Sequence, residues 1–172
     1  NRSGKYHITL VDMNNYNFFP PLLYQLAAGF MEPSSISYPF RRLLRKYKNA
    51  RFRMASLQEV IPAENKLILS NGELSYDILV MATGAESIFF GNKEVEEKAM
   101  PMKTVGDALM LRNLVYTRLE RATRTQDKEQ RRKLLSFAIA GAGPTGVELS
   151  GIFAEMKQNI MRKDYPELTY DD

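Results

Sequence analysis

Three glycines spaced as Gly141-x-Gly143-x-x-Gly146 follow a short apolar run and precede a stretch typical of a helix. This spacing is typical of turns that bind the pyrophosphate of a dinucleotide. Gly141 would allow the tight turn, Gly143 would let the backbone approach the phosphates, and Gly146 would let the helix pack closely. The amides and the dipole of the first helical turn attract phosphate. The alternative is a plain strand-to-helix turn without a ligand.

An acid at the end of a strand is a second candidate. Asp12 closes the apolar and β-branched residues 6–12, at the place where an acid of a dinucleotide domain binds the ribose. Its alternative role is to cap a loop. No glycine turn precedes Asp12, and no acid at the end of a strand follows the turn at Gly141. The acids near the expected distance, about 20 residues on, are Asp164, Glu167, Asp171 and Asp172. We therefore expect the second half of one nucleotide site and the first half of another, in a sequence that covers a middle portion of the protein.

The composition limits the chemistry further. The 172 residues hold no cysteine and a single histidine, His7. Disulfides, thiolate metal sites and redox dithiols are therefore excluded within this sequence, and we expect no metal site and a structural role for His7. Redox chemistry would need a bound organic cofactor. The net charge of +4 permits contact with nucleotides or an anionic membrane surface, and we expect no nucleic-acid partner.

The first half of the chain predicts strands, short helices and one hairpin. A strand at residues 6–12 and a loop at residues 13–17 are followed by a helix at residues 22–28 that stops at Gly29. Asn71-Gly72 favours a hairpin turn. The other segments are a helical stretch from Pro33 that becomes basic at residues 41–46, strands near residues 51–57 and 66–69, and a buried strand at residues 78–81.

The second half of the chain predicts two helices around one strand. Thr104 and Asp107 resemble a capping box, and the helix after it carries an apolar face of Ala108, Leu111, Val115 and Leu119. The remaining segments are a charged linker at residues 123–133, a strand at residues 134–140, a helix from Pro144 to about residue 163, and a strand beginning at Tyr170. This order is typical of an α/β protein with a break near residue 130.

Several longer strings resemble one family. They are residues 14–25 (NNYNFFPPLLYQ), 37–42 (SYPFRR), 82–84 (ATG), 89–91 (FFG), 102–104 (MKT) and 143–149 (GPTGVEL). Together they resemble the type II NADH dehydrogenases, single-subunit NADH:quinone oxidoreductases of the two-dinucleotide-domain flavoprotein superfamily. The sequence departs at Pro20, where the family often has Gln, and at Ala55, where Gly is usual.

The resemblance implies a fold and a reaction. The fold is α/β, a Rossmann-like FAD/NAD(P)-binding fold with a parallel sheet and a small antiparallel insert, incomplete at both ends. Residues 1–130 would be part of the FAD-binding domain, and residues 131–172 the start of an inserted NADH-binding domain. FAD and NAD are the implied cofactors: NADH would deliver hydride to FAD, and a membrane quinone would then take the electrons.

The resemblance also implies roles for particular residues. Asp12 would bind the adenosine ribose of FAD, Leu57 would lie by the adenine, and Ala82, Thr83 and Gly84 would line the flavin. Gly141, Gly143 and Gly146 would take the NADH pyrophosphate. Glu148 would act near the nicotinamide and quinone, and Gln25 would face the isoalloxazine. The alternatives are a dipole-favoured acid at Glu148 and a surface polar group at Gln25.

Partners and location follow from the same resemblance. We expect a peripheral protein on the cytoplasmic face of the inner membrane, with a homodimer as a further expectation. The basic run at residues 41–53 is either a solvated face or a membrane contact. Two other functions stay open: a flavin-dependent NAD(P)H reductase with a ferredoxin- or rubredoxin-type acceptor, and an inactive nucleotide-binding fragment.

Overall fold

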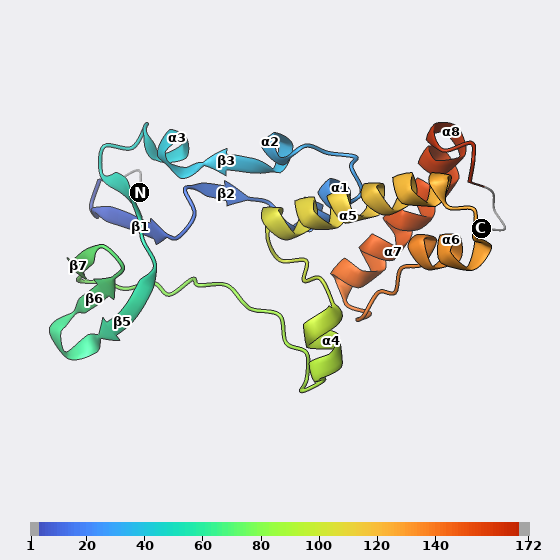
Figure 1. Cartoon of the computed structure of the whole chain (residues 1–172). Helices are drawn as coiled ribbons and strands as arrows, with labels where there is room; N and C mark the ends of the chain where they lie inside the picture. Colours follow the sequence, from blue (N-terminus) through green and yellow to red (C-terminus); the bar gives the residue numbers. More distant parts are fainter. Residues whose placement is uncertain (1–3, 169–172) are drawn as a thin grey trace. The chain divides into compact units, whose positions relative to one another are not determined.

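The computed structural model describes residues 4–168 of the chain, which form two compact units (Figure 1). The first unit comprises the described residues of Asn1–Phe18 together with Ser37–Ala85. The second comprises Phe19–Ile36 and the described residues of Glu86–Asp172. Each unit therefore joins segments that are distant in the sequence.

A parallel pair of strands carries Asp12 in the first unit. β1 (Ile8–Asp12) pairs in parallel with β4 (Ala50–Met54), as the apolar and β-branched residues of both segments predict. α3 (Phe40–Leu44) packs on β4, where the rings of Phe40 and Phe52 stack with centroids 5.1 Å apart. This pair confirms both predicted strands and the parallel sheet.

A three-stranded antiparallel sheet completes the first unit. β5 (Leu57–Ile61), β6 (Lys66–Leu69) and β7 (Gly72–Ser75) form a meander with a short 3₁₀ turn, η2 (Pro62–Glu64), between the first two. β6 and β7 form the predicted hairpin, but it turns through Ser70 and Asn71 with Gly72 paired to Leu69, one residue before the predicted Asn71-Gly72 turn. The buried centre of this sheet consists of Ala55, Leu67 and Leu69. The small antiparallel insert is therefore confirmed, and β5 is a strand beyond those predicted.

A second strand pair occupies segments that the sequence predicted differently. β2 (Tyr16–Phe18) lies in the predicted loop, and β3 (Ser37–Pro39) interrupts the predicted helical stretch. The two pair antiparallel, and the helix begun at α2 (Pro33–Ile36) stops before them. Pro39 disfavours the helical conformation at Tyr38, and the aromatic residues on both strands favour extended pairing.

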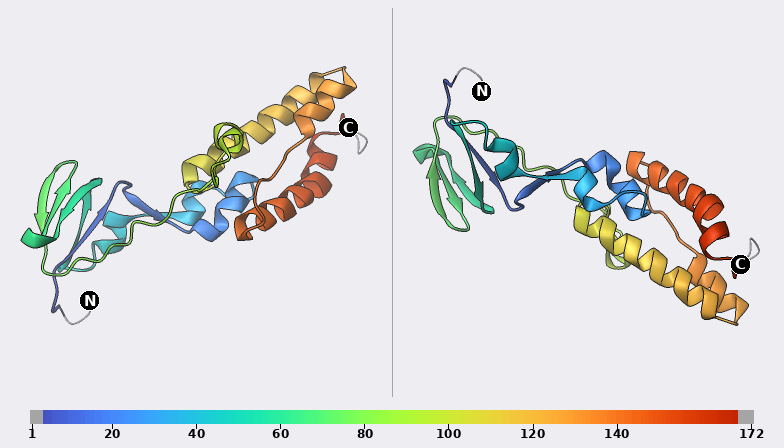
Figure 2. Two further views of the ribbon diagram at one scale, coloured as in Figure 1. Left: turned by 90° about the horizontal axis from the view of Figure 1, so that it is seen from below. Right: turned by 90° about the horizontal axis from the view of Figure 1, so that it is seen from above.

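Helices form the second unit around α5 (Val105–Arg124). α1 (Leu23–Ala27) follows the 3₁₀ turn η1 (Pro20–Leu22) and contacts both α5 and α7 (Pro144–Met156) (Figure 2). Gly29, two residues beyond its end, has a φ of +79°, which agrees with the predicted stop. The buried face of α5 consists of Val105, Ala108, Leu111, Val115, Leu119 and Ala122, which confirms the predicted apolar face. This helical core supports the glycine turn.

The ends of the long helices follow the sequence signals. Thr104 accepts a hydrogen bond from the Asp107 amide at 3.1 Å, and the Asp107 carboxylate accepts one from the Thr104 amide at 2.8 Å, which confirms the capping box. The predicted helix from Pro144 consists of α7 (Pro144–Met156), a π-helical segment η3 (Lys157–Met161) and α8 (Arg162–Asp164). α4 (Lys93–Lys98) is a further short helix. Tyr170, Asp171 and Asp172 lie outside the described residues.

Two predicted strands and one predicted linker are wrong. Residues 78–81 form no strand, and the side chains of Ile78 and Val80 are 69% and 79% exposed. Most of the predicted linker at residues 123–133 is helical, because α6 (Lys128–Leu135), capped by Asp127, begins within it. The predicted strand at residues 134–140 is absent, since residues 136–143 have no regular structure. A strand needs a neighbour for its backbone hydrogen bonds. Within residues 4–168, no segment pairs with either predicted strand.

Candidate nucleotide-binding site

The glycine turn has a backbone that favours glycine at two of its three positions. Gly141 has a φ of +113°, which side chains of L residues rarely allow. A Cβ on Gly146 would overlap the carbonyl oxygen of Gly141. A Cβ on Gly143 would meet nothing within 4 Å. The turn is therefore closed tightly on itself, and its Gly143 side stays open to a ligand.

The start of α7 offers hydrogen-bond donors and no negative charge. Pro144 is the first helical residue, and Gly143 before it has no side chain to cap the helix. The first backbone hydrogen bond near this end runs from the Val147 amide to the Gly143 carbonyl at 3.1 Å. The amides of Thr145 and Gly146 thus belong to the first turn, where a helix has no internal partner for its donors. This end of the helix suits an anionic group such as a phosphate.

Glu148 and Gln25 occupy the same unit as the glycine turn. Glu148 is exposed on the second turn of α7, and the hydroxyl of Ser150 nearby donates to the Gly146 carbonyl at 2.7 Å. Gln25 lies on α1, half-buried, and its Nε2 donates to the Tyr24 hydroxyl at 3.1 Å. Among the described residues, no hydrogen bond or ion pair joins Gln25 to Glu148.

Asp12 caps the loop after β1 and keeps one carboxylate oxygen that accepts no hydrogen bond from the described residues. It ends β1, and its Oδ1 accepts a hydrogen bond from the Asn14 amide at 2.7 Å. Its backbone carbonyl accepts one from the Ala55 amide at 3.0 Å. A carboxylate has two acceptor oxygens, so capping the loop leaves Oδ2 to accept from a second donor. The loop-capping alternative is therefore correct and compatible with ribose binding.

The other predicted flavin residues also lie in the first unit. Leu57 begins β5 and packs, half-buried, against the cluster of Ala55, Leu67 and Leu69, as Val11 of β1 does. The end of β1 and the start of β5 thus border one apolar cluster. Ala82, Thr83 and Gly84 are exposed and have no regular structure, so the structure does not bring them onto that cluster.

One apolar cavity in the second unit was not predicted from the sequence. It has a volume of about 320 Å³ and lies between α5, the segment after α6, and α7. Its lining includes Val115, Leu119, Phe137, Ile139, Phe153 and Met156. Finding it would require knowing that residues 136–143 are irregular, which the strand prediction for this segment excluded.

One tyrosine in the same unit has a strongly shifted pKa. Burial, together with the neighbouring Glu120 carboxylate, which shares a hydrogen bond with it, raises the pKa of Tyr165 to about 12. Tyr165 follows α8, whereas Glu120 lies on α5. The pair therefore ties the end of the helical segment to the central helix.

Two absences among the described residues bear on the site. Within the part of the chain that the structure describes, no group of three or more His, Cys, Asp or Glu side chains is placed to hold a metal ion. No helix between residues 4 and 168 is both long and apolar enough to cross a membrane.

Comparison with known proteins assigns the family. The model of the pyridine nucleotide-disulphide oxidoreductases matches residues 1–165, which is nearly the whole sequence. The chain belongs to the pyridine nucleotide-disulphide oxidoreductase family. The chain that carries the glycine turn and Asp12 is therefore a member of a family whose name refers to a pyridine nucleotide.

Two relatives in this family are type II or alternative NADH dehydrogenases. The chain is 36% identical over 159 residues to the type II NADH:quinone oxidoreductase Ndh of Mycobacterium tuberculosis, covering 90% of this chain and 34% of that protein. It is 33% identical over 176 residues to the mitochondrial external alternative NAD(P)H-ubiquinone oxidoreductase B2 of Arabidopsis thaliana, covering 95% of this chain and 30% of that protein. The chain thus spans about a third of the length of the curated relatives it matches. The predicted resemblance to type II NADH dehydrogenases is confirmed.

Solved structures confirm the predicted fold class. NDH2 from Plasmodium falciparum in complex with RYL-552 matches with a TM-score of 0.87 and 29% identity, over 95% of this chain and 34% of that one. The same protein in complex with NADH matches with a TM-score of 0.86 and 29% identity, over 94% of this chain and 35% of that one. The Rossmann-like FAD/NAD(P)-binding α/β fold of this pyridine nucleotide-disulphide oxidoreductase is therefore confirmed.

Proposed function

We propose that the chain is part of an FAD-dependent NADH:quinone oxidoreductase of type II. The overall reaction would convert NADH, a proton and a quinone into NAD⁺ and the quinol. The observation that carries the proposal is the uncapped N-terminus of α7 behind the turn of Gly141, Gly143 and Gly146. The similarity to NADH:quinone oxidoreductases over 90% of the chain supports it.

The glycine turn would hold the pyrophosphate of NADH. The first-turn amides of Thr145 and Gly146 would donate to the phosphate oxygens, and the helix dipole would stabilise their negative charge. A side chain on Gly143 would stand between these amides and the ligand, because its Cβ would occupy the open side of the turn. The solved relative that is in complex with NADH supports this ligand.

The first unit would contribute half of an FAD site. Asp12 would accept hydrogen bonds from ribose hydroxyls through the oxygen that Asn14 leaves open, and Leu57 would border the adenine from the apolar cluster below it. Ala82, Thr83 and Gly84 would line the flavin with backbone. Bound FAD supplies a ring system that accepts two electrons with a hydride and passes them on. Residues 1–130 would then be the FAD part and residues 131–172 the NADH part.

Glu148 and Gln25 would border the reacting groups. Glu148 lies one turn after the first-turn amides, so it would face the nucleotide beyond its phosphates, near the nicotinamide and the quinone. The Gln25 amide would donate to the isoalloxazine. Both side chains are polar without an ionic partner among the described residues, so each is available for a ligand contact.

The electron acceptor would be a quinone dissolved in the membrane. The names of the relatives in Mycobacterium tuberculosis and Arabidopsis thaliana support a quinone over a ferredoxin- or rubredoxin-type protein. The protein would act as a peripheral protein on the cytoplasmic face of the inner membrane, as a homodimer. These assignments concern the whole protein that carries this sequence.

Steady-state oxidation of NADH tests the proposed function. The full-length protein, reconstituted with FAD, should oxidise NADH rapidly only when a short-chain soluble quinone is present, with one quinol formed for each NADH. Oxidation that requires a ferredoxin or rubredoxin in place of quinone would assign the reductase alternative. Binding of NADH without oxidation by any acceptor would leave a nucleotide-binding protein and contradict the proposal.

A further inference from the structure

The positive charge of the chain is concentrated in one short segment. Residues 37–53 contain seven of the 24 basic residues and no acidic residue. The other 17 basic residues are outnumbered by the 20 acidic ones, so the rest of the chain carries a net charge of −3 while the whole carries +4. Charge localised in this way creates a positive potential over one part of the surface.

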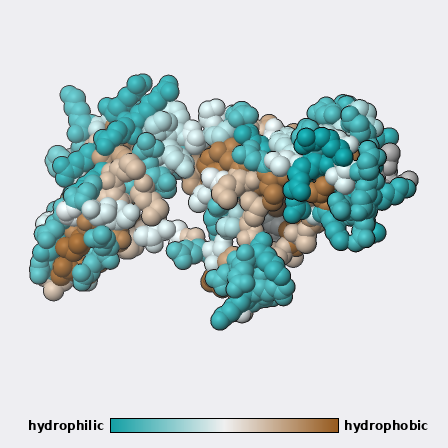
Figure 3. Space-filling model, in the orientation of Figure 1, coloured by the Kyte–Doolittle hydropathy of each residue, from teal (hydrophilic) through white to brown (hydrophobic). Residues whose placement is uncertain are grey.

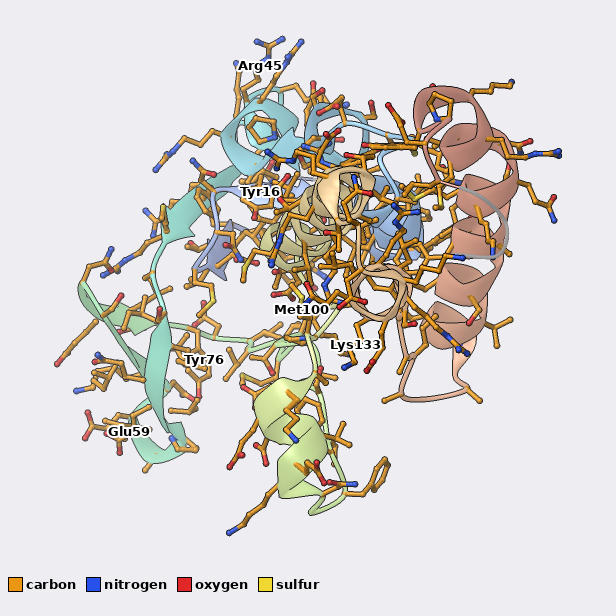
Figure 4. The ribbon with its side chains drawn as sticks, turned by 45° about the vertical axis from the view of Figure 1, so that its right-hand side comes forward. Tyr16, Arg45, Glu59, Tyr76, Met100 and Lys133 are labelled. Carbon is orange, nitrogen blue, oxygen red and sulfur yellow. The ribbon has the colours of Figure 1, made fainter. Side chains whose placement is uncertain are left out.

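Five of these cations form one exposed surface with three apolar neighbours. We call it the α3 patch, and it consists of Arg41, Arg42, Arg45, Lys46 and Lys48 with Tyr38, Leu43 and Tyr47. All eight are exposed; Figure 4 shows Arg45 extending from α3 away from the ribbon, and Figure 3 shows hydrophilic residues over α3. Among the described residues, none of the five cations takes part in a salt bridge. The charge of the patch is therefore not neutralised by any of residues 4–168.

Packing against β4 orders the α3 patch. Phe40 is buried and stacks on Phe52 of β4, and the guanidinium of Arg41 lies 5.3 Å from the centre of the Phe52 ring. The amide of Arg45 donates to the Arg41 carbonyl at 3.0 Å, which closes the turn of the helix. The patch is therefore an ordered surface, and binding through it would cost little ordering of the backbone.

Aromatic and aliphatic side chains are interleaved with the cations. Arg42 lies 5.3 Å from the ring centre of Tyr38, and Lys46 lies 5.3 Å from that of Tyr47. Leu43 stays 41% exposed between them. Tyrosine rings, an aliphatic side chain and surrounding cations are the combination that favours the interface of an anionic bilayer. A polyanion such as RNA would bind the cations, but an exposed leucine would contribute nothing to that binding.

We propose that the α3 patch docks the protein on the surface of an anionic phospholipid bilayer. The five cations would lie among the headgroups, and Leu43 and Tyr47 would reach the boundary of the acyl chains. The proposal goes beyond the proposed function, because it assigns the surface that meets the membrane and does not depend on turnover. Vesicle binding is measured without NADH or quinone, so failure of one proposal is distinguishable from failure of the other.

Co-sedimentation with vesicles tests this proposal. The full-length protein is mixed with vesicles of phosphatidylcholine that contain phosphatidylserine, and with vesicles of phosphatidylcholine alone. The triple variant Arg45→Gln, Lys46→Gln, Lys48→Gln removes three charges from the patch. A matched control, Lys93→Gln, Lys103→Gln, Lys163→Gln, removes three exposed charges from the second unit. The patch variant should bind anionic vesicles about a hundredfold more weakly, because each cation near the surface contributes about fivefold.

A second variant separates a bilayer from other polyanions. Leu43→Ser with Tyr47→Ser keeps every charge, and it should weaken binding to anionic vesicles while leaving binding to single-stranded RNA unchanged. Equal binding by the charge variant and its control would overturn the proposal. Tighter binding of the native protein to RNA than to anionic vesicles, or equal binding to neutral vesicles, would overturn it as well.

Discussion

At the residue scale, the candidate site consists of groups whose local contacts leave part of their hydrogen-bonding capacity free. Asp12 shows this best, because Asn14 occupies Oδ1 and the loop after β1 is thereby closed. The same carboxylate can accept a ribose hydroxyl on its other oxygen. Local structure and ligand binding therefore share one side chain.

Replacing Asp12 by Asn should separate these two tasks. The amide oxygen of Asp12→Asn still accepts from the Asn14 amide, so the thermal unfolding temperature should change little. Hydrogen bonds to a charged acceptor contribute about 1.5–3 kcal/mol, so the Kd for FAD should rise about 10- to 100-fold in a fluorescence titration. Asp77→Asn, an exposed acid of the same unit, is the control. An unchanged Kd for FAD in the Asp12 variant would show that Asp12 only caps the loop.

Gly146 and Gly151 on one helix give a matched pair for the NADH site. A Cβ at Gly146 would overlap the Gly141 carbonyl, whereas one at Gly151 would meet nothing within 4 Å. Gly146→Val should therefore displace the turn from the helix and raise the Kd for NADH about 10- to 100-fold, the loss of one charge-assisted hydrogen bond. Gly151→Ala should keep the Kd and add about 0.5–1 kcal/mol to the free energy of unfolding. Equal effects on NADH binding would argue against the turn as the pyrophosphate site.

The raised pKa of Tyr165 predicts that the free energy of unfolding depends on pH in the alkaline range. Burial, with a contribution from Glu120, raises its pKa to about 12 in the folded state, above the ordinary value of 10.0. Above pH 10 the unfolded chain loses this proton first, so Tyr165 should cost stability as the pH rises from about 10 to about 12. Below pH 10 its contribution is fully present. The free energy of unfolding of Tyr165→Phe should fall less over this interval. The difference in absorbance at alkaline pH between the native and variant proteins reports the titration of Tyr165, and its midpoint should lie near 12. A midpoint near 10 would contradict the burial of this tyrosine.

At the element scale, signals carried by neighbouring residues predicted structure well. The Thr104 and Asp107 spacing, the apolar face of α5 and the proline at the start of α7 each describe interactions within a few residues. The strand at β1 and the hairpin of β6 and β7 were also predicted, because their partners are present in the described chain. The glycine turn belongs to this class, since Gly141 and Gly146 meet across five positions.

Signals that depend on distant partners failed. Residues 78–81 and 134–140 have the apolar runs of buried strands, yet no described strand lies beside them to complete the hydrogen bonds. At residues 134–135 the local preference for helix prevailed over the predicted strand, because Asp127 caps α6 and Lys133 pairs with Glu129 at 2.7 Å. The strand pair of β2 and β3 joins residues about 20 positions apart, which no periodicity within either segment indicates. The position of Ala82 to Gly84 was unpredictable for the same reason.

The capping box offers a direct test at this scale. Thr104→Ala removes the side chain that accepts from the Asp107 amide, and loss of such a cap costs about 1 kcal/mol of unfolding free energy. Thr104→Ser should restore most of it. Thr117→Ala, at an exposed position in the middle of the same helix, should be neutral or slightly stabilising. Denaturant unfolding measures all three, and equal stability of the Thr104→Ala and Thr117→Ala variants would contradict the cap.

At the scale of the whole molecule, the candidate sites are divided between the two compact units. Asp12 and Leu57 belong to the first unit, and the turn of Gly141 to Gly146 belongs to the second. The charge is divided as well, since the α3 patch lies in the first unit and the remaining chain is net acidic. The first unit therefore holds the proposed adenosine end of the FAD site and the proposed membrane surface, and the second unit holds the proposed pyrophosphate turn for NADH.

The most direct measurement is the absorbance of FAD in the full-length protein under anaerobic conditions. We predict that adding NADH bleaches the flavin band within the turnover time of the enzyme, and that a soluble quinone then restores it fully. The Gly146→Val variant should bleach only at higher NADH concentrations, and Gly151→Ala should match the native protein. A flavin band that NADH leaves unchanged, or that quinone fails to restore, would contradict the assignment of an NADH:quinone oxidoreductase.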